Sequence, residues 1–230
     1  LKYDTYMFIS YKKFIICVID KQNLNLIYKV EKIIENYFNK LDFEKLNDFL
    51  EGNIFKIEKN LKCFVKNVYL ILDTNDFLTA EMSIKSNNIG NKINLKSLYY
   101  PLSDAKDQFQ KSLDDKKIIH MFIENYNINN NNYSKLPKNL ECESFSLSIK
   151  FICLSNEISF EIEKILKKYQ ILINQWLSLK YVEKFYDENN SNIFQTACKV
   201  VAGYNTNEVV LVNKTAKNKG FFEKFFNFFS

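Results

Sequence analysis

The chain has 230 residues, 47% of them hydrophobic and 26% charged, so it is long enough to bury the core of one or two domains. Its formal net charge is +5, but every basic residue is a lysine, and no arginine supplies the planar fork that recognises phosphates and bases. Lysine, asparagine, isoleucine, phenylalanine and tyrosine are all abundant, as an AT-rich genome would produce. We therefore attribute the positive charge to codon usage and expect no nucleic-acid partner. No apolar run approaches the roughly 18 residues of a membrane-spanning helix, and LKYDTYMFIS lacks the features of a signal peptide.

The first third of the chain predicts strands around one helix. Two apolar runs, 6–10 and 14–20, indicate a pair of strands. Asp42 is a good N-cap for a helix whose apolar residues recur at helical spacing, namely Phe43, Leu46, Leu50, Ile54, Ile57 and Leu61. The runs 68–73 and 78–84 predict two further strands.

The middle of the chain predicts a helix, then two strands joined by a loop. Ser103 is expected to cap a polar helix that continues to about residue 113. A strand over 118–126 is followed by an asparagine-rich loop at 127–137. In the run 145–153 apolar and polar residues alternate, which predicts a strand with one buried face.

The remaining elements alternate in type. We expect a helix over 156–170, a short strand at 171–173, helices at 177–186 and 193–203, and a strand at 208–212. Helices that alternate with strands favour a mixed α/β or α+β fold.

Residues that could carry chemistry are few. The sole histidine, His120, has no cysteine or acidic residue at metal-ligand spacing, so a packed strand residue is the expected role. The glycines are isolated, which argues against a phosphate-binding loop; they are Gly52, Gly90, Gly203 and Gly220. We therefore expect no enzymatic activity, no cofactor and no metal site.

The cysteines are odd in number and form no Cys-x-x-Cys pair, so we expect reduced thiols in the cytoplasm rather than a disulfide framework. They are Cys17, Cys63, Cys142, Cys153 and Cys198.

Residues 118–153 resemble the bacterial cell-division protein family FtsA. In both, a strand carrying Ile-His is followed by a tyrosine, a loop with a proline and an alternating strand; the matching residues are Ile119, His120, Tyr126, Ile128 and Pro137. Two departures are Ile123, where the family has proline, and Asn129, where it has aspartate.

The resemblance extends in both directions along the chain. FISYKKFIICVI resembles the first hairpin of the family, with Lys13 at its lysine, but Phe8 and Ser10 replace the aspartate and glycine of its phosphate loop. IFQTACKVVAGYN resembles the final core helix, with Gly203 at its glycine. The family binds ATP between two lobes, and these replacements imply that this chain does not.

The resemblance implies a partial actin-like lobe. Residues 1–76 and 154–212 would form a core like subdomain 1A, and 77–153 an inserted α+β module like subdomain 1C, related to the SHS2 domain. The second lobe, which should lie between Leu179 and Asn192 and on which FtsZ docks in the family, is missing, so the resemblance leaves FtsZ binding open. Subdomain 1C mediates self-association and contacts with other division proteins.

Because the outer surface of this 1C-like module is expected to be its interaction face, the exposed lysines Lys135 and Lys138 are candidate residues for self-association or for contact with division proteins.

The end of the chain resembles the family's linker and membrane-targeting helix, at 213–219 and 220–230. On a helical wheel six phenylalanines occupy an arc of about 160°; they are Phe221, Phe222, Phe225, Phe226, Phe228 and Phe229. Lysines beside the arc, among them Lys219 and Lys224, suit an anionic lipid surface. About ten residues rise only about 15 Å, so such a helix lies on a membrane without crossing it.

The sequence thus predicts a peripheral protein on the cytoplasmic side of the membrane, acting as an anchor and interaction platform in cell division. The alternative is a soluble adaptor whose C-terminal helix docks into a groove of a partner protein.

Overall fold

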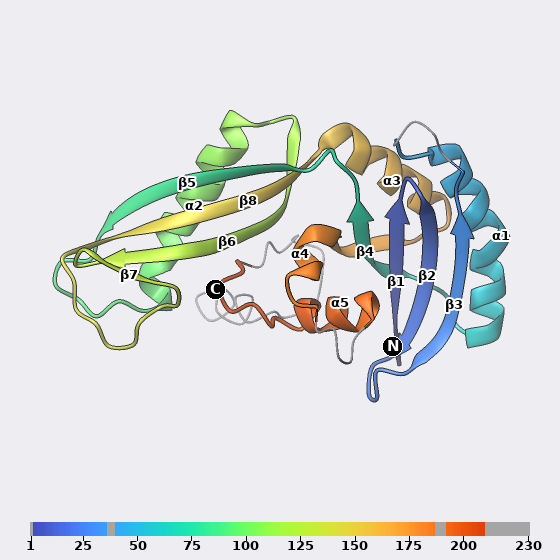
Figure 1. The fold of residues 1–230 in the computed structure, drawn as a ribbon, viewed down its shortest axis with the longest axis horizontal. Coiled ribbons are helices and arrows are strands. Elements are labelled where there is room, and N and C mark those ends of the chain that lie inside the picture. Colours follow the sequence, from blue (N-terminus) through green and yellow to red (C-terminus); the bar gives the residue numbers. More distant parts are fainter. Residues whose placement is uncertain (1, 36–39, 187–191, 210–230) are drawn as a thin grey trace. The chain divides into compact units, whose positions relative to one another are not determined.

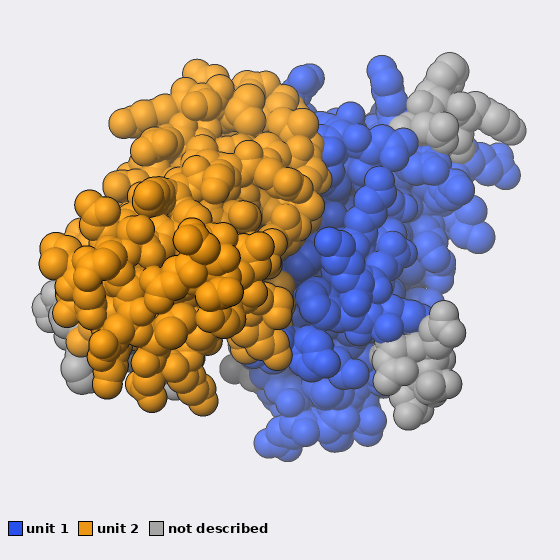
Figure 2. All heavy atoms as spheres, turned by 60° about the vertical axis from the view of Figure 1, so that its left-hand side comes forward, with its two compact units in different colours: residues 1–77, 156–204 blue, residues 78–155, 205–230 orange. Residues whose placement is uncertain are grey.

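The structure is a computed structural model that describes residues 2–35, 40–186 and 192–209. The chain divides into two compact units, shown in blue and orange in Figure 2. Unit 1 comprises residues 1–77 and 156–204, and unit 2 comprises residues 78–155 and 205–230. The chain therefore enters and leaves unit 2 between β4 and α3 of unit 1 and returns to unit 2 after α5 (Figure 1).

Unit 1 is built on a five-stranded sheet with the order β3-β2-β1-β4-β9 (Figure 1). The first three strands form an antiparallel meander, and β4 and β9 run parallel to β1. The strands are β1 (Tyr3–Ser10), β2 (Lys13–Asp20), β3 (Leu26–Ile33), β4 (Asn67–Asp73) and β9 (Leu172–Ser178).

Helices cover both faces of this sheet. The central strands β1, β2 and β4 are almost continuously buried, as expected when neither face meets water. Phe14 of β2 contacts Phe49 of α1 on one face. On the other face the side chain of Tyr6 on β1 forms a hydrogen bond with the side chain of Cys198 on α5. The helices are α1 (Phe43–Leu61), α3 (Asn156–Lys168), α4 (Leu179–Glu183) and α5 (Ile193–Val201).

The helix α1 begins where its cap predicts. Asp42 accepts a hydrogen bond from the backbone N–H of Lys45 at 2.9 Å, and this bond is the main reason that the pKa of Asp42 is lowered. The helix passes through Gly52 and ends at Leu61, and its C-cap Lys62 has a left-handed backbone with φ of 54°.

Among its described residues, unit 2 is a four-stranded antiparallel sheet, β5-β8-β6-β7, covered on one face by a helix. Its strands are β5 (Leu78–Asn87), β6 (Lys116–Ile128), β7 (Asn131–Tyr133) and β8 (Ser144–Ser155), and its helix is α2 (Leu95–Ser112). The alternation predicted for 145–153 is confirmed, since Phe145, Leu147, Ile149, Phe151 and Cys153 are all buried.

The mixed α/β fold class is confirmed, whereas several predicted elements need correction. The helix α2 begins at Leu95 and not after Ser103, because Asn94 forms a capping box with Ser97. Pro101 lies inside this helix, where the packing of Leu98 and Leu102 against the sheet offsets its missing hydrogen bond.

Three other segments differ from the predictions. The meander strand β3 was not predicted, and the loop 127–137 contains the short strand β7. Residues 205–209 belong to unit 2, although the core was predicted to extend over 154–212. Of the strand predicted at 208–212, residues 210–212 lie outside the described residues.

Candidate interaction module and its C-terminal attachment

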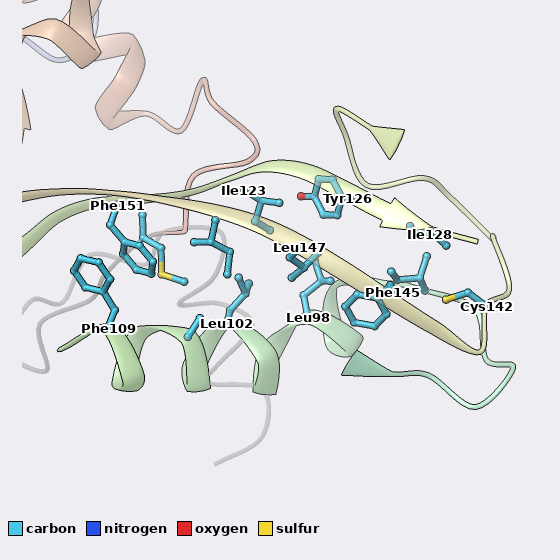
Figure 3. Packing of buried hydrophobic residues seen from close by; sticks show 14 of the residues in the cluster. Leu98, Leu102, Phe109, Ile123, Tyr126, Ile128, Cys142, Phe145, Leu147 and Phe151 are labelled. Carbon is cyan, nitrogen blue, oxygen red and sulfur yellow. The ribbon is translucent and has the colours of Figure 1, made fainter. Parts of the chain in front are cut away.

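The core of unit 2 lies between α2 and one face of its sheet. In Figure 3 the side chains of Leu98, Leu102 and Phe109 point from α2 toward the strands. The rings of Phe109 and Phe151 stack with their centroids 4.0 Å apart and an interplanar angle of 13°. Burial of this many apolar side chains gives unit 2 a hydrophobic core of its own.

The segment 205–209 pairs with part of β6. The backbone N–H of Ile123 donates to the carbonyl of Asn207 at 3.0 Å, and the N–H of Val209 donates to the carbonyl of Met121 at 2.8 Å. The Asn207 side chain donates to the carbonyl of Ser134 at 2.7 Å, and Val209 packs against the unit 2 core. The last described residues are thus held by unit 2, and in the sequence they precede the predicted linker at 213–219 and the phenylalanine-rich segment 220–230.

His120 and Glu208 form a buried pair at this attachment. Nδ1 of His120 lies 2.7 Å from Oε1 of Glu208, and the two side chains are 0% and 10% exposed. As expected, His120 is a packed residue of a strand. It also has an acidic partner, Glu208, which lies 88 residues away along the chain. Local spacing could not reveal that partner, and the described residues contain no cluster of three or more metal-ligating side chains.

The opposite face of the unit 2 sheet carries a row of alternating charges. Nζ of Lys150 on β8 donates to Glu81 on β5 at 2.8 Å and to Glu124 on β6 at 2.9 Å. The pKa of Lys150 is raised by its hydrogen bonds to Glu81 and Glu124. These charges run across three adjacent strands and end at β5.

The two lysines singled out as candidate contact residues, Lys135 and Lys138, are exposed between β7 and β8. The side chains of nearby asparagines form hydrogen bonds within this region of unit 2. Asn127 donates to Asn132 at 2.9 Å, and Asn129 donates to the carbonyl of Glu141 at 2.9 Å. The positive charges therefore lie on the connection between β7 and β8, next to a hairpin with internal hydrogen bonds.

In unit 1, the β1–β2 hairpin contains Phe8, Ser10 and Lys13, the residues that the sequence comparison aligned with a phosphate loop. Oγ of Ser10 accepts hydrogen bonds from the backbone N–H groups of Lys12 and Lys13 at 3.2 and 3.0 Å. Nζ of Lys13 lies 5.6 Å from the centroid of the Phe8 ring and 3.5 Å from Glu31. The backbone N–H groups and the Lys13 ammonium that could bind a phosphate thus already contact side chains of this chain.

The predicted membrane-binding residues lie outside the described residues; they are Lys219, Phe221, Phe222, Lys224, Phe225, Phe226, Phe228 and Phe229. Within the part of the chain that the structure describes, no helix has the length and apolar character needed to span a bilayer.

No known protein-family profile matches the chain, and no curated protein matches it in sequence. Among solved structures, the chain is similar to one described as the PilM-PilN type IV pilus biogenesis complex, with a TM-score of 0.47 and 6% sequence identity. The similarity covers 79% of this chain and 48% of that chain. It is also similar to the cytoplasmic domain of EpsL, an inner-membrane component of the type II secretion system of Vibrio cholerae, with a TM-score of 0.38 and 10% identity over 81% and 61% of the two chains.

A third similar structure is a Bacteroides thetaiotaomicron protein described as having an actin-like ATPase fold and unknown function, with a TM-score of 0.36 and 13% identity over 80% and 55% of the two chains. The chain thus spans 48% to 61% of the length of these three solved chains. At TM-scores below 0.5 these similarities assign neither a family nor a function to the chain.

Proposed function

We propose that this chain is a non-enzymatic, membrane-associated scaffold in which unit 2 binds proteins and the C-terminal segment binds anionic lipid. At a finer level we propose an FtsA-like role in cell division, on the cytoplasmic side of the membrane. The attachment of residues 205–209 to β6 is the observation that carries this proposal, because it joins the predicted lipid-binding segment to unit 2.

The lipid-binding part of the proposal rests on the chemistry of residues 213–230. Each lysine near an anionic leaflet contributes about 1 kcal/mol, and each partly buried phenyl ring adds about 1–2 kcal/mol. Lys214, Lys217 and Lys219 lie in the sequence immediately before the six phenylalanines. The combination suits reversible binding to the surface of a membrane.

The non-enzymatic part of the proposal is supported by the β1–β2 hairpin. Since the Ser10 hydroxyl accepts from two backbone N–H groups, a phosphate would have to displace it and separate Lys13 from Phe8 and Glu31. We therefore propose that the chain neither binds nor hydrolyses ATP. Micromolar, magnesium-dependent binding in a nucleotide titration would contradict this.

The protein-binding part of the proposal places contacts on the connection between β7 and β8, which carries Lys135 and Lys138. Reversal of both charges, with Lys135→Glu and Lys138→Glu, should weaken self-association or the capture of division proteins while the protein still floats with liposomes. A pull-down that is unchanged by the double substitution would remove these lysines from the contact surface.

The deciding experiment is flotation with anionic liposomes of the full chain and of a variant lacking residues 220–230. The full chain should float and the shortened chain should not. Equal flotation of both would refute lipid binding by this segment. If neither floats but a partner protein is retained only by the full chain, the segment belongs to a soluble adaptor.

A further inference from the structure

The outer edge of β5 is long and regular. The strand pairs with β8 over ten consecutive residues, Leu78–Asn87, without a register shift, whereas β6 pairs with β8 through two shifts. Among the described residues no strand pairs with the other side of β5. Natural edge strands are usually short or interrupted by a bulge or a proline, because exposed N–H and C=O groups are a template for another strand. β5 has neither interruption.

We propose that a second copy of this chain pairs with β5 in antiparallel orientation, about a two-fold axis that passes through Ser83. In this register Glu81 lies opposite Lys85 of the other copy, Met82 opposite Ile84, and Ser83 opposite Ser83. Pairing over residues 79–87 would form about eight to ten backbone hydrogen bonds and join the two four-stranded sheets into one.

The side chains of β5 select this register. Alternate residues, including Glu81, Ser83 and Lys85, are exposed, and Met82 and Ile84 between them are half-buried. A register centred between two residues would oppose exposed and half-buried positions. A register centred on Glu81 or on Lys85 would place like charges opposite each other, which is destabilising.

Registers centred on Met82 or on Ile84 leave Glu81 and Lys85 opposite uncharged residues. Centring on Ser83 pairs both charges in each copy.

The charge row on the sheet continues into the second copy. Glu124, Lys150 and Glu81 already alternate in sign across β6, β8 and β5. Lys85 of the second copy would add the next positive charge beside Glu81, whose side chain is 65% exposed. Lys85 is opposite Ser146 on β8 and has no ion pair with any described residue. The dimer therefore gives each Lys85 a carboxylate partner.

The other face of β5 supports the same arrangement. Ala80, Met82 and Ile84 are only partly buried against the core beneath α2. Pairing would place Met82 of one copy against Ile84 of the other, and so extend the apolar layer across the axis. The inference deepens the self-association included in the proposed function, but its tests use no membrane, so that failure of one is distinguishable from failure of the other.

A cysteine cross-link tests the axis directly. In the full chain, Ser83→Cys places two thiols opposite each other, at a Cβ separation of about 4.5–5.5 Å that a small adjustment makes compatible with a disulfide. The matched control is Thr79→Cys on the same exposed face, because position 79 lies opposite Asn87 and not opposite itself. Mild oxidation should give a covalent dimer with Ser83→Cys only; equal cross-linking of the two variants, or none with Ser83→Cys, would overturn the proposal.

Mixing two charge variants tests the register without relying on a single variant that could simply misfold. Glu81→Lys and Lys85→Glu should each run as the 27.4 kDa monomer in light scattering, because each places like charges opposite each other. An equimolar mixture should recover a mass about twice as large, since position 81 of one variant and position 85 of the other again carry opposite charges. A mixture that remains monomeric, or single variants that dimerise as well as the unmodified chain, would overturn the proposal.

Discussion

The attachment of the C-terminal segment to unit 2 predicts that Glu208→Ala releases residues 205–209 from β6. The substitution removes the carboxylate that meets Nδ1 of His120, whose side chain is fully buried. Loss of a partner for a buried polar group costs about 1–3 kcal/mol, which corresponds to a factor of about 5 to 150 in the attachment equilibrium. Glu208→Gln is the matched control, because it keeps the oxygen acceptor and removes only the charge.

Amide hydrogen exchange measures this equilibrium at a single residue. The N–H of Ile123 donates to the carbonyl of Asn207, so its exchange requires release of the segment. It should exchange about 5 to 150 times faster in Glu208→Ala than in the unmodified chain, with Glu208→Gln closer to the unmodified chain. Leu147 on the central strand β8 should be unaffected. The same Ile123 exchange rate in all three proteins would refute the reasoning.

Three further predictions concern the two cores. Asp42→Ala should lower the free energy of unfolding of unit 1 by about 1 kcal/mol, because the helix cap is lost. Urea titration followed by the fluorescence of Trp176 measures this, and an unchanged midpoint would show that the cap does not stabilise unit 1. Burial raises the pKa of Cys153 to about 12, so at pH 8 its thiol should be alkylated far more slowly than that of the more accessible Cys63. Peptide mass spectrometry measures both rates, and comparable rates would indicate that the unit 2 core opens. Phe151→Ala should destabilise unit 2 by about 3–5 kcal/mol, seen by circular dichroism as an earlier transition, and the absence of a shift would contradict the packing in Figure 3.

The sequence was most informative where an element's own residues determine it. The cap at Asp42 and the spacing of apolar residues predicted α1, and the alternation from Phe145 to Cys153 predicted which face of β8 is buried. The apolar runs of β1 and β2 likewise predicted the hairpin. In each case the local pattern of apolar residues, periodic in α1 and β8 and continuous in β1 and β2, reports burial directly.

Two of the missed features depend on contacts that are distant along the chain, and a third depends on a local helix cap. All residues of the strand β3 are exposed or half-buried, so its pairing with β2 and not its own hydrophobicity defines it. The start of α2 was placed too late, because Asn94 and not Ser103 supplies its cap. Glu208 could not be assigned to His120 from a separation of 88 residues.

The most direct measurement of the central claim compares Phe225→Asp with Asn227→Asp in liposome flotation. Both variants add one negative charge to the same predicted helix, but position 225 lies within the apolar arc and position 227 opposite it. The account predicts that Phe225→Asp lowers partitioning to anionic liposomes at least about tenfold, whereas Asn227→Asp floats nearly as well as the unmodified chain. Equal loss in the two variants, or no loss in either, would contradict a phenylalanine face that binds the membrane.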